Sequence, residues 1–231
     1  MSETYQLGKT IETEQPCSSS WEEAYLRFET PEQEIAKFRR RLLRLGAEKW
    51  DKNLRVVELF CGRGNALHAL SSLGFRNIEG VDLSDALLEK YRGPAKCYVC
   101  DCRHLPFDNA SRDILIVQGG LHHLPCLPDD LAMTLAEMQR VLRPCGFVVI
   151  VEPWLTPFLR FVHMFCASKL ARRCWKRIDA LATMIANERQ TYERWLKSPG
   201  LITQLLEARF DRVKLATRWG KLIYIGQPRQ G

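Results

Sequence analysis

The sequence lacks any apolar run approaching the roughly 18 residues that a membrane-spanning helix needs. Its first residues, Met1 to Thr4, lack the basic-then-apolar pattern of a secretory signal. Internal repeats are also missing. The nine cysteines are odd in number and dispersed, which suits a reducing compartment better than a disulfide framework. These absences predict a cytoplasmic protein.

The composition is that of an ordinary globular protein, with 46% hydrophobic and 26% charged residues. A chain of 231 residues is long enough for one α/β domain with a full core. The net charge of +7 is uneven, because residues 153–231 hold 15 Lys and Arg but only five Asp and Glu. This basic region would suit an anionic substrate, a membrane surface or RNA.

Strand and helix patterns alternate along the chain and predict a parallel, doubly wound sheet. Strands are expected at 54–60, 77–82, 95–100, 113–117, 147–151, 211–219 and 221–227. The tight link at Gly220 predicts that the last two form an antiparallel hairpin. Five segments follow from the pattern: a disordered tail (1–20), an N-terminal helical cap (21–50), a core (51–152), a helical lid (153–198), and a helix and hairpin that complete the sheet (199–231).

A strand, a tight turn and a helix meet at residues 56–70, around Glu58-Leu59-Phe60-Cys61-Gly62-Arg63-Gly64-Asn65. Glycines in such a turn let the backbone approach a ligand at the helix N-terminus. A second strand ends in Asp82, 24 residues after Glu58 and well placed for a ribose diol. The nicotinamide fingerprint fits poorly, because Leu67 occupies its third glycine position. The acid before the turn instead favours a cationic cofactor such as S-adenosylmethionine.

The turn resembles motif I of the class I S-adenosylmethionine-dependent methyltransferases, whose usual form is acid-x-Gly-x-Gly-x-Gly. Phe60 and Asn65 stand at the first and last glycine positions. Three later segments also resemble this superfamily, and they come in the expected order: Asp101-Cys102 with Leu105-Pro106-Phe107, Gln118 to Pro125, and Glu137 to Gly146. The last two are similar to the small-molecule branch, which includes the methyltransferase type 11 and ubiquinone-menaquinone methyltransferase-like proteins.

The resemblance implies a Rossmann-like three-layer sandwich with a seven-stranded, mostly parallel sheet, an antiparallel last strand and a helical lid. It implies S-adenosyl-L-methionine as the cofactor. The expected cofactor-binding residues are Glu58, Phe60, Cys61, Gly62, Gly64, Asn65, Asp82, Leu83, Asp101, Cys102 and Gln118. The aromatic helix that begins at Trp21 would close over the cofactor, or would simply pack on the sheet.

His122 and His123 follow the fourth strand, where the methyl group is expected to emerge. An imidazole titrates near the working pH, so one of them, with His122 favoured, would deprotonate or orient an acceptor hydroxyl. Glu152 at the end of strand five is a second candidate. The alternative interpretation is that both histidines are turn residues that pack on the lid.

Cysteine and histidine at residues 97–104 have ligand types that suit zinc. However, strand alternation places Cys97 and Cys100 on opposite faces, and no second ligand pair follows at finger spacing. No metal site is therefore expected. Gln118-Gly119-Gly120-Leu121 also differs from the Asn/Asp-Pro-Pro-aromatic tetrapeptide of enzymes that methylate adenine or glutamine nitrogen.

The sequence thus predicts methyl transfer to a small-molecule or lipid-linked acceptor, with oxygen favoured over nitrogen or carbon. Apolar and basic residues alternate along 154–177, which predicts peripheral membrane contact or a lid packed on the sheet. Two other interpretations stay open. One is an RNA-modifying methyltransferase, although nucleic acid is a less favoured partner. The other is an inactive methyltransferase-fold partner subunit.

Overall fold

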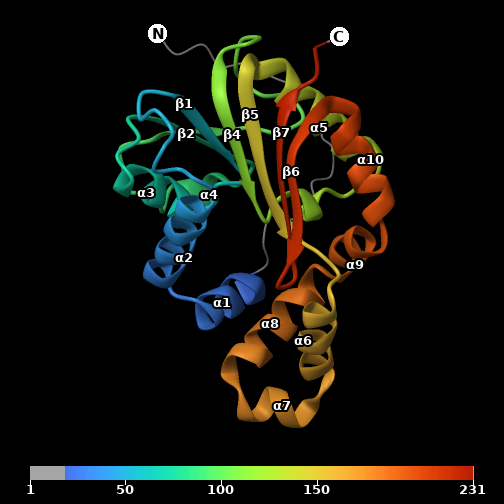
Figure 1. Ribbon diagram of the computed structural model, residues 1–231. Coiled ribbons are helices and arrows are strands. Elements are labelled where there is room, and N and C mark those ends of the chain that lie inside the picture. The colour runs from blue at the N-terminus through green and yellow to red at the C-terminus, as the bar shows by residue number, and fades with distance from the viewer. Residues whose placement is uncertain (1–18, 231) are drawn as a thin grey trace, which may run out of the picture.

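A seven-stranded sheet forms the centre of the protein (Figure 1). The computed structural model describes residues 19–230, so most of the predicted tail at 1–20 lies outside the described residues. The strands are β1 (Arg55–Leu59), β2 (Asn77–Asp82), β3 (Lys96–Val99), β4 (Arg112–Gln118), β5 (Leu142–Pro153), β6 (Phe210–Arg218) and β7 (Lys221–Pro228). Their order is β3-β2-β1-β4-β5-β7-β6, and β7 runs antiparallel to both of its neighbours. The predicted fold class is confirmed.

Helices cover both faces of the sheet (Figure 1). On one face lie α2 (Pro31–Arg44), α3 (Asn65–Ser72) and the short α4 (Asp85–Leu88), and on the other lie α5 (Asp129–Val141), α9 (Arg189–Lys197) and α10 (Pro199–Arg209). Alternate β4 side chains point to opposite cores, with Ile114 and Ile116 packed towards α2 and α3 and Leu115 and Val117 towards α5. The continuous apolar run in β4 is therefore explained by burial on both faces.

Helix α2 begins at residues whose side chains favour a helix start. Thr30 and Gln33 form a capping box, and Pro31 occupies the first helical turn. These local hydrogen bonds satisfy backbone donors that the first turn leaves open. Phe38 and Leu42 then anchor the helix in the core beside α3.

Strand β5 is longer than expected. Arg112 pairs with Leu142 and Ile114 pairs with Phe147, so residues 143–146 loop out of the ladder between the two pairs. Residues 143–146, which come before the strand expected at 147–151, therefore form an irregularity within a longer strand. It interrupts the ladder without ending the strand, because β5 pairs with β4 at Leu142 before it and again from Phe147 to Val151 after it.

The insertion after β5 folds into α6 (Pro157–Ala167), α7 (Lys169–Cys174) and α8 (Lys176–Asn187), and leads into α9. These three helices extend beyond the carboxyl ends of the parallel strands (Figure 1). Helix α1 (Ser19–Phe28) packs against α8 at the same end. None of the helices within residues 19–230 is long and apolar enough to cross a membrane.

Candidate active site

Three carboxylates and one amide side chain lie where the parallel strands end. Glu58 lies near the end of β1, Asp82 ends β2, Gln118 ends β4 and Glu152 lies near the end of β5. Because these strands are parallel neighbours, their carboxyl ends share one edge of the sheet, which is where open α/β sheets bind ligands.

Asp82 holds the turn between β1 and α3. Its Oδ2 accepts a hydrogen bond from the Gly62 amide at 2.7 Å, and its Oδ1 accepts one from the Ser84 amide at 2.8 Å. Gly64 has a φ of +76°, and a Cβ there would lie 2.2 Å from the Tyr91 ring. The turn therefore requires glycine at this position for both backbone conformation and space.

Phe60 replaces the first glycine of the motif, and the fold accommodates it in a specific way. Its φ is +57°, a conformation that non-glycine residues rarely adopt. The aromatic ring occupies the space above Gly120, where a Cβ would lie 2.2 Å from Cγ of Phe60. The glycine missing at 60 is thus matched by a glycine at 120, on the neighbouring strand's loop.

Glu58 is buried and only partly satisfied. Gln118 donates to its Oε1 at 3.4 Å and in turn accepts from Arg41 at 2.7 Å, whereas Oε2 has no hydrogen-bond partner among residues 19–230. Burial raises the pKa of Glu58 to about 8. A buried carboxylate oxygen without a partner fits a cationic group of a bound molecule.

The other expected cofactor residues differ in whether their side chains are exposed or already make contacts within the protein. Asn65 donates to Glu34 of α2 at 2.7 Å, and Cys61 is buried under the turn. Leu83 is 57% exposed beside Asp82, which leaves it free to pack on a flat ring.

Asp101 and Cys102 at the end of β3 are largely engaged within the protein. Burial raises the pKa of Asp101, but hydrogen bonds from Arg103 outweigh this effect and hold it below the ordinary value. Arg103 also donates to Asp130 at 2.6 Å. Cys102 is buried, with its sulfur 3.5 Å from the Thr134 hydroxyl. The role in cofactor binding that the resemblance implies for this pair stays a prediction.

His122 and Glu152 form a buried pair. Nδ1 of His122 lies 2.8 Å from Oε2 of Glu152, whose Oε1 accepts from the amides of Gly120 and Leu121 at 2.8 and 2.9 Å. Burial lowers the pKa of His122, but its interactions with Glu152 and Glu188 outweigh this and raise it to about 9. These contacts fix the orientation of the ring and leave Nε2 pointing away from Glu152.

Glu188 of the lid and Trp21 of α1 lie beside the His122–His123 pair. Glu188, between α8 and α9, lies 3.7 Å from Nε2 of His122 and 3.7 Å from Nδ1 of His123. Burial and the neighbouring His122 lower the pKa of His123 to about 4. Trp21 of α1 contacts the edge of His123, with ring centroids 6.5 Å apart. The lid and the N-terminal cap therefore meet at the histidine pair.

Helix α1 is tied to the motif I turn by charge. Glu22 forms ion pairs with Arg63 of the turn and with Lys90 after α4. Tyr25, stacked on Trp21, donates a hydrogen bond to Glu34, the carboxylate that also holds Asn65. Helix α1 therefore contacts the same turn that the resemblance implies as part of the cofactor site.

Sequence reasoning did not find Glu188, Arg41 or Glu34. Glu188 lies 65 residues beyond His123, in a lid with no recognisable motif. Arg41 and Glu34 belong to an ordinary amphipathic helix, and only their burial and contacts set them apart. The sequence offered one signal, which was Glu34 on the face of α2 that carries its apolar side chains. A glutamate is rarely buried unless it has a partner, so its position indicated a specific contact.

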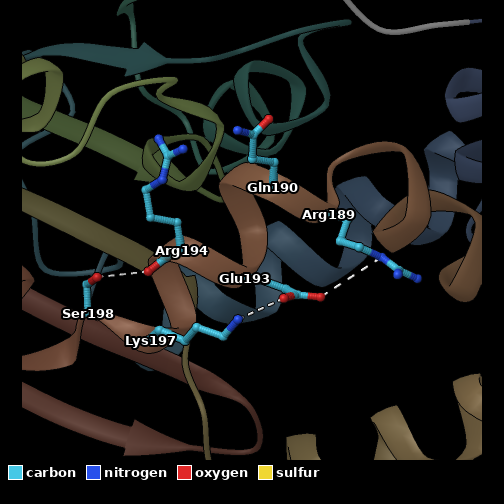
Figure 2. A pocket seen from close by; sticks show the side chains of 6 residues that line it. All are labelled: Arg189, Gln190, Glu193, Arg194, Lys197 and Ser198. Atoms are coloured by element: carbon cyan, nitrogen blue, oxygen red, sulfur yellow. Dashed lines mark hydrogen bonds and ion pairs between the residues drawn. The ribbon is translucent and has the colours of Figure 1, made fainter.

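A separate pocket lies on the outer side of α9 (Figure 2). Glu193 sits between Arg189 and Lys197, and its carboxylate lies 2.9 Å from Nζ of Lys197. The pocket is lined by Arg189, Gln190, Glu193, Arg194, Lys197 and Ser198. None of these residues belongs to the strand-end cluster, so this pocket is not the candidate site.

Comparison with known proteins adds to this geometry. Residues 57–150 match a family described as "Methyltransferase domain". This part of the chain is a class I methyltransferase domain. Its cofactor is S-adenosylmethionine, and the residues present fit that molecule because Glu58 offers a buried, unpartnered oxygen to its cationic groups.

Curated relatives match the methyltransferase domain over part of their length. Demethylmenaquinone methyltransferase of Staphylococcus aureus is 31% identical over 109 residues, which is 44% of each chain. The ubiquinone/menaquinone biosynthesis C-methyltransferase UbiE of Geotalea daltonii is 29% identical over 131 residues, 51% of this chain and 53% of its own. The chain therefore spans about half the length of the curated relatives it matches.

A solved structure resembles nearly the whole chain. A protein from Pyrococcus horikoshii superposes with a TM-score of 0.69 over 92% of this chain and 100% of its own, at 18% sequence identity. At that identity the likeness shows the fold alone, which includes the region outside residues 57–150.

Proposed function

We propose that the protein transfers a methyl group from S-adenosylmethionine to a hydroxylated, lipid-linked acceptor of the quinone class. The observation that carries this proposal is the buried His122–Glu152 pair, set beside the motif I turn with Nε2 of the imidazole facing the lid. The curated relatives are named for methylation of quinone precursors, which supports the acceptor class. The oxygen preference expected from the sequence stays a prediction.

S-adenosylmethionine supplies an activated methyl group when it is bound. The chain's own residues hold and orient the reactants and exclude water from them. Glu58 and Asp82 would hold the cofactor, and Glu152 fixes His122 so that positive charge on the imidazole lies beside the acceptor oxygen. That charge would stabilise the negative charge on an acceptor hydroxyl that is bound in its ionised form. Trp21 and the lid close the site above the histidines.

The lid surface, formed by exposed side chains of residues 155–175, supports the lipid-linked part of the proposal. Helix α6 has no buried residue although most of its side chains are apolar. The exposed apolar members are Leu155, Phe158, Phe161, Met164, Leu170 and Trp175. Exposed basic residues lie among them, namely Arg160, Lys169 and Arg173, and Lys176 follows directly, whereas Arg172 is half-buried and pairs with Asp179. Such a surface suits an anionic bilayer, from which a tailed acceptor would enter beneath the lid.

An assay of methyl transfer to a demethylated naphthohydroquinone with an isoprenoid tail, in anionic vesicles, tests this function. We expect a singly methylated product, whose NMR spectrum shows whether oxygen or ring carbon received the methyl group. Leu170→Glu, which places a charge at a 72% exposed apolar position, should lower turnover in vesicles but not with a water-soluble, tail-less acceptor. Absence of transfer to any hydroquinone, with salt-sensitive transfer to RNA instead, would replace this proposal by the RNA-modifying one.

Cofactor affinity should depend on pH through Glu58. The pKa of this carboxyl is about 8 in the free protein, so the group is mostly protonated at pH 7. A cationic cofactor favours the ionised form, and binding therefore releases a proton. Affinity should rise by up to about tenfold per pH unit from pH 6 and level off above about 8. Calorimetry in two buffers of different ionisation enthalpy measures the proton released.

Glu58→Gln provides the comparison. The variant should bind S-adenosylmethionine more weakly at pH 8 and show no pH dependence between 6 and 8, because glutamine does not titrate. An identical pH slope in the variant and the wild type would remove Glu58 from the cofactor site.

A further inference from the structure

We propose that His122, His123 and Glu188 form a binding site for a divalent transition-metal ion. One ligand atom from each of the three residues lies within 4.8 Å of the other two. At 3.7 Å, Glu188 is too far from either imidazole nitrogen for a strong hydrogen bond. The three groups therefore converge on a common point, with more space between them than hydrogen-bonded side chains would leave.

The spacing is close to what an ion requires. Zinc–nitrogen and zinc–oxygen bonds of about 2.1 Å in a tetrahedral site place neighbouring ligand atoms about 3.4 Å apart. The two 3.7 Å distances involve different oxygens of Glu188, Oε2 to Nε2 of His122 and Oε1 to Nδ1 of His123. Both carboxylate oxygens therefore face the histidines, and Glu188 would reach the ion with both oxygens or, after a small rotation of the carboxylate, with one. The His122 and His123 rings lie side by side at a tilt of 35°, with centroids 4.1 Å apart.

Glu152 does not face the proposed ion but hydrogen-bonds to one of its ligands, His122. Metal-binding histidines usually donate their other ring N–H to a carboxylate or carbonyl, which fixes the tautomer and the ring orientation. Nδ1 of His122 donates to Glu152 at 2.8 Å, and Glu152 is held by the backbone amides of Gly120 and Leu121. The remaining nitrogen of His122, Nε2, is the one that faces Glu188.

Two imidazoles and one carboxylate suit Zn²⁺, Fe²⁺, Mn²⁺ or Co²⁺ and leave coordination positions open. A bound ion would put positive charge where the protonated His122 puts it in the free protein. It would also tie the lid to the loop after β4, because Glu188 joins α8 to α9 while the histidines follow β4. The use of an open position by the acceptor oxygen rests on the proposed function, whereas binding of the ion does not.

Titration of the EDTA-treated, dialysed full-length protein with Co²⁺ and Mn²⁺ tests the site. We expect one equivalent to bind, with visible Co²⁺ d–d bands and no thiolate charge-transfer band, since the ligands are nitrogen and oxygen. Glu188→Gln and His123→Ala should each weaken binding by about tenfold or more. Glu193→Gln, on the outer side of α9, is the matched control and should bind like the wild type (Figure 2).

Three outcomes would overturn the site: no stoichiometric binding, equal binding by Glu188→Gln, or a thiolate band that assigns the ion to cysteines. Unfolding temperature and S-adenosylmethionine affinity, measured on the same samples, show whether each variant is folded. They also separate the two proposals, because failure of the metal site leaves cofactor binding intact. Loss of cofactor binding in the wild type would instead contradict the methyltransferase function.

Discussion

Asp82→Ala is expected to weaken S-adenosylmethionine binding by about 100-fold or more. Two hydrogen bonds from a ribose diol to a carboxylate are worth about 1.5–3 kcal/mol each, which sets this magnitude. The substitution also removes the carboxylate that accepts hydrogen bonds from the Gly62 and Ser84 amides. The motif I turn would therefore be less well held against the end of β2. Calorimetric titration with S-adenosylmethionine and S-adenosylhomocysteine measures the effect.

Two further variants separate contact with the cofactor from support of the turn. Asp82→Asn keeps an oxygen for one backbone amide but removes the charge, and it should retain the fold while losing most of the affinity. Asp85→Ala, three residues later and exposed, should bind like the wild type. Unchanged affinity in Asp82→Asn would mean that the cofactor does not use this carboxylate. No binding by the wild type would favour an inactive, partner-binding chain.

Glu152→Gln is expected to lower turnover by about 10²- to 10³-fold, the range found when one group that stabilises charge in the transition state is lost, and to leave S-adenosylmethionine affinity within about twofold. The glutamine oxygen still accepts from Gly120 or Leu121, but its amide group no longer provides a carboxylate for Nδ1 of His122. The imidazole then loses the partner that fixes its orientation. Single-turnover rates and cofactor affinity, measured together, test this division.

The conservative variant matters because Glu152 is fully buried and holds three donors. Glu152→Ala would leave those donors without partners, at a cost of about 1–3 kcal/mol each, and would confuse misfolding with loss of function. Turnover in Glu152→Gln close to that of the wild type would show that the pair only stabilises the loop after β4. An equal loss of cofactor affinity would also contradict a role confined to the acceptor side.

Much of the core was predictable from the sequence because the relevant signals are local. Alternation and β-branched runs located the strands, and Thr30, Pro31 and Gln33 located the start of α2. Asp82 was expected at the end of the second strand, where the structure places it, and its contact with the Gly62 amide of the motif I turn was found only in the structure. The structure of residues 153–198 was harder to predict, because α6, α7, α8 and α9 carry ordinary amphipathic patterns that do not indicate what each helix packs against.

By itself, then, the sequence determined the class of fold and the cofactor, and it predicted the edge of the sheet where the cofactor would bind, since each depends on residues close together in the chain. Only the tertiary structure decided which distant side chains meet. Phe60 reaches Gly120 because β1 and β4 are neighbours in the sheet, and Glu188 reaches His122 and His123 because α8 and α9 fold back over the end of β4. Such contacts depend on strand order and helix packing, which local periodicity does not encode.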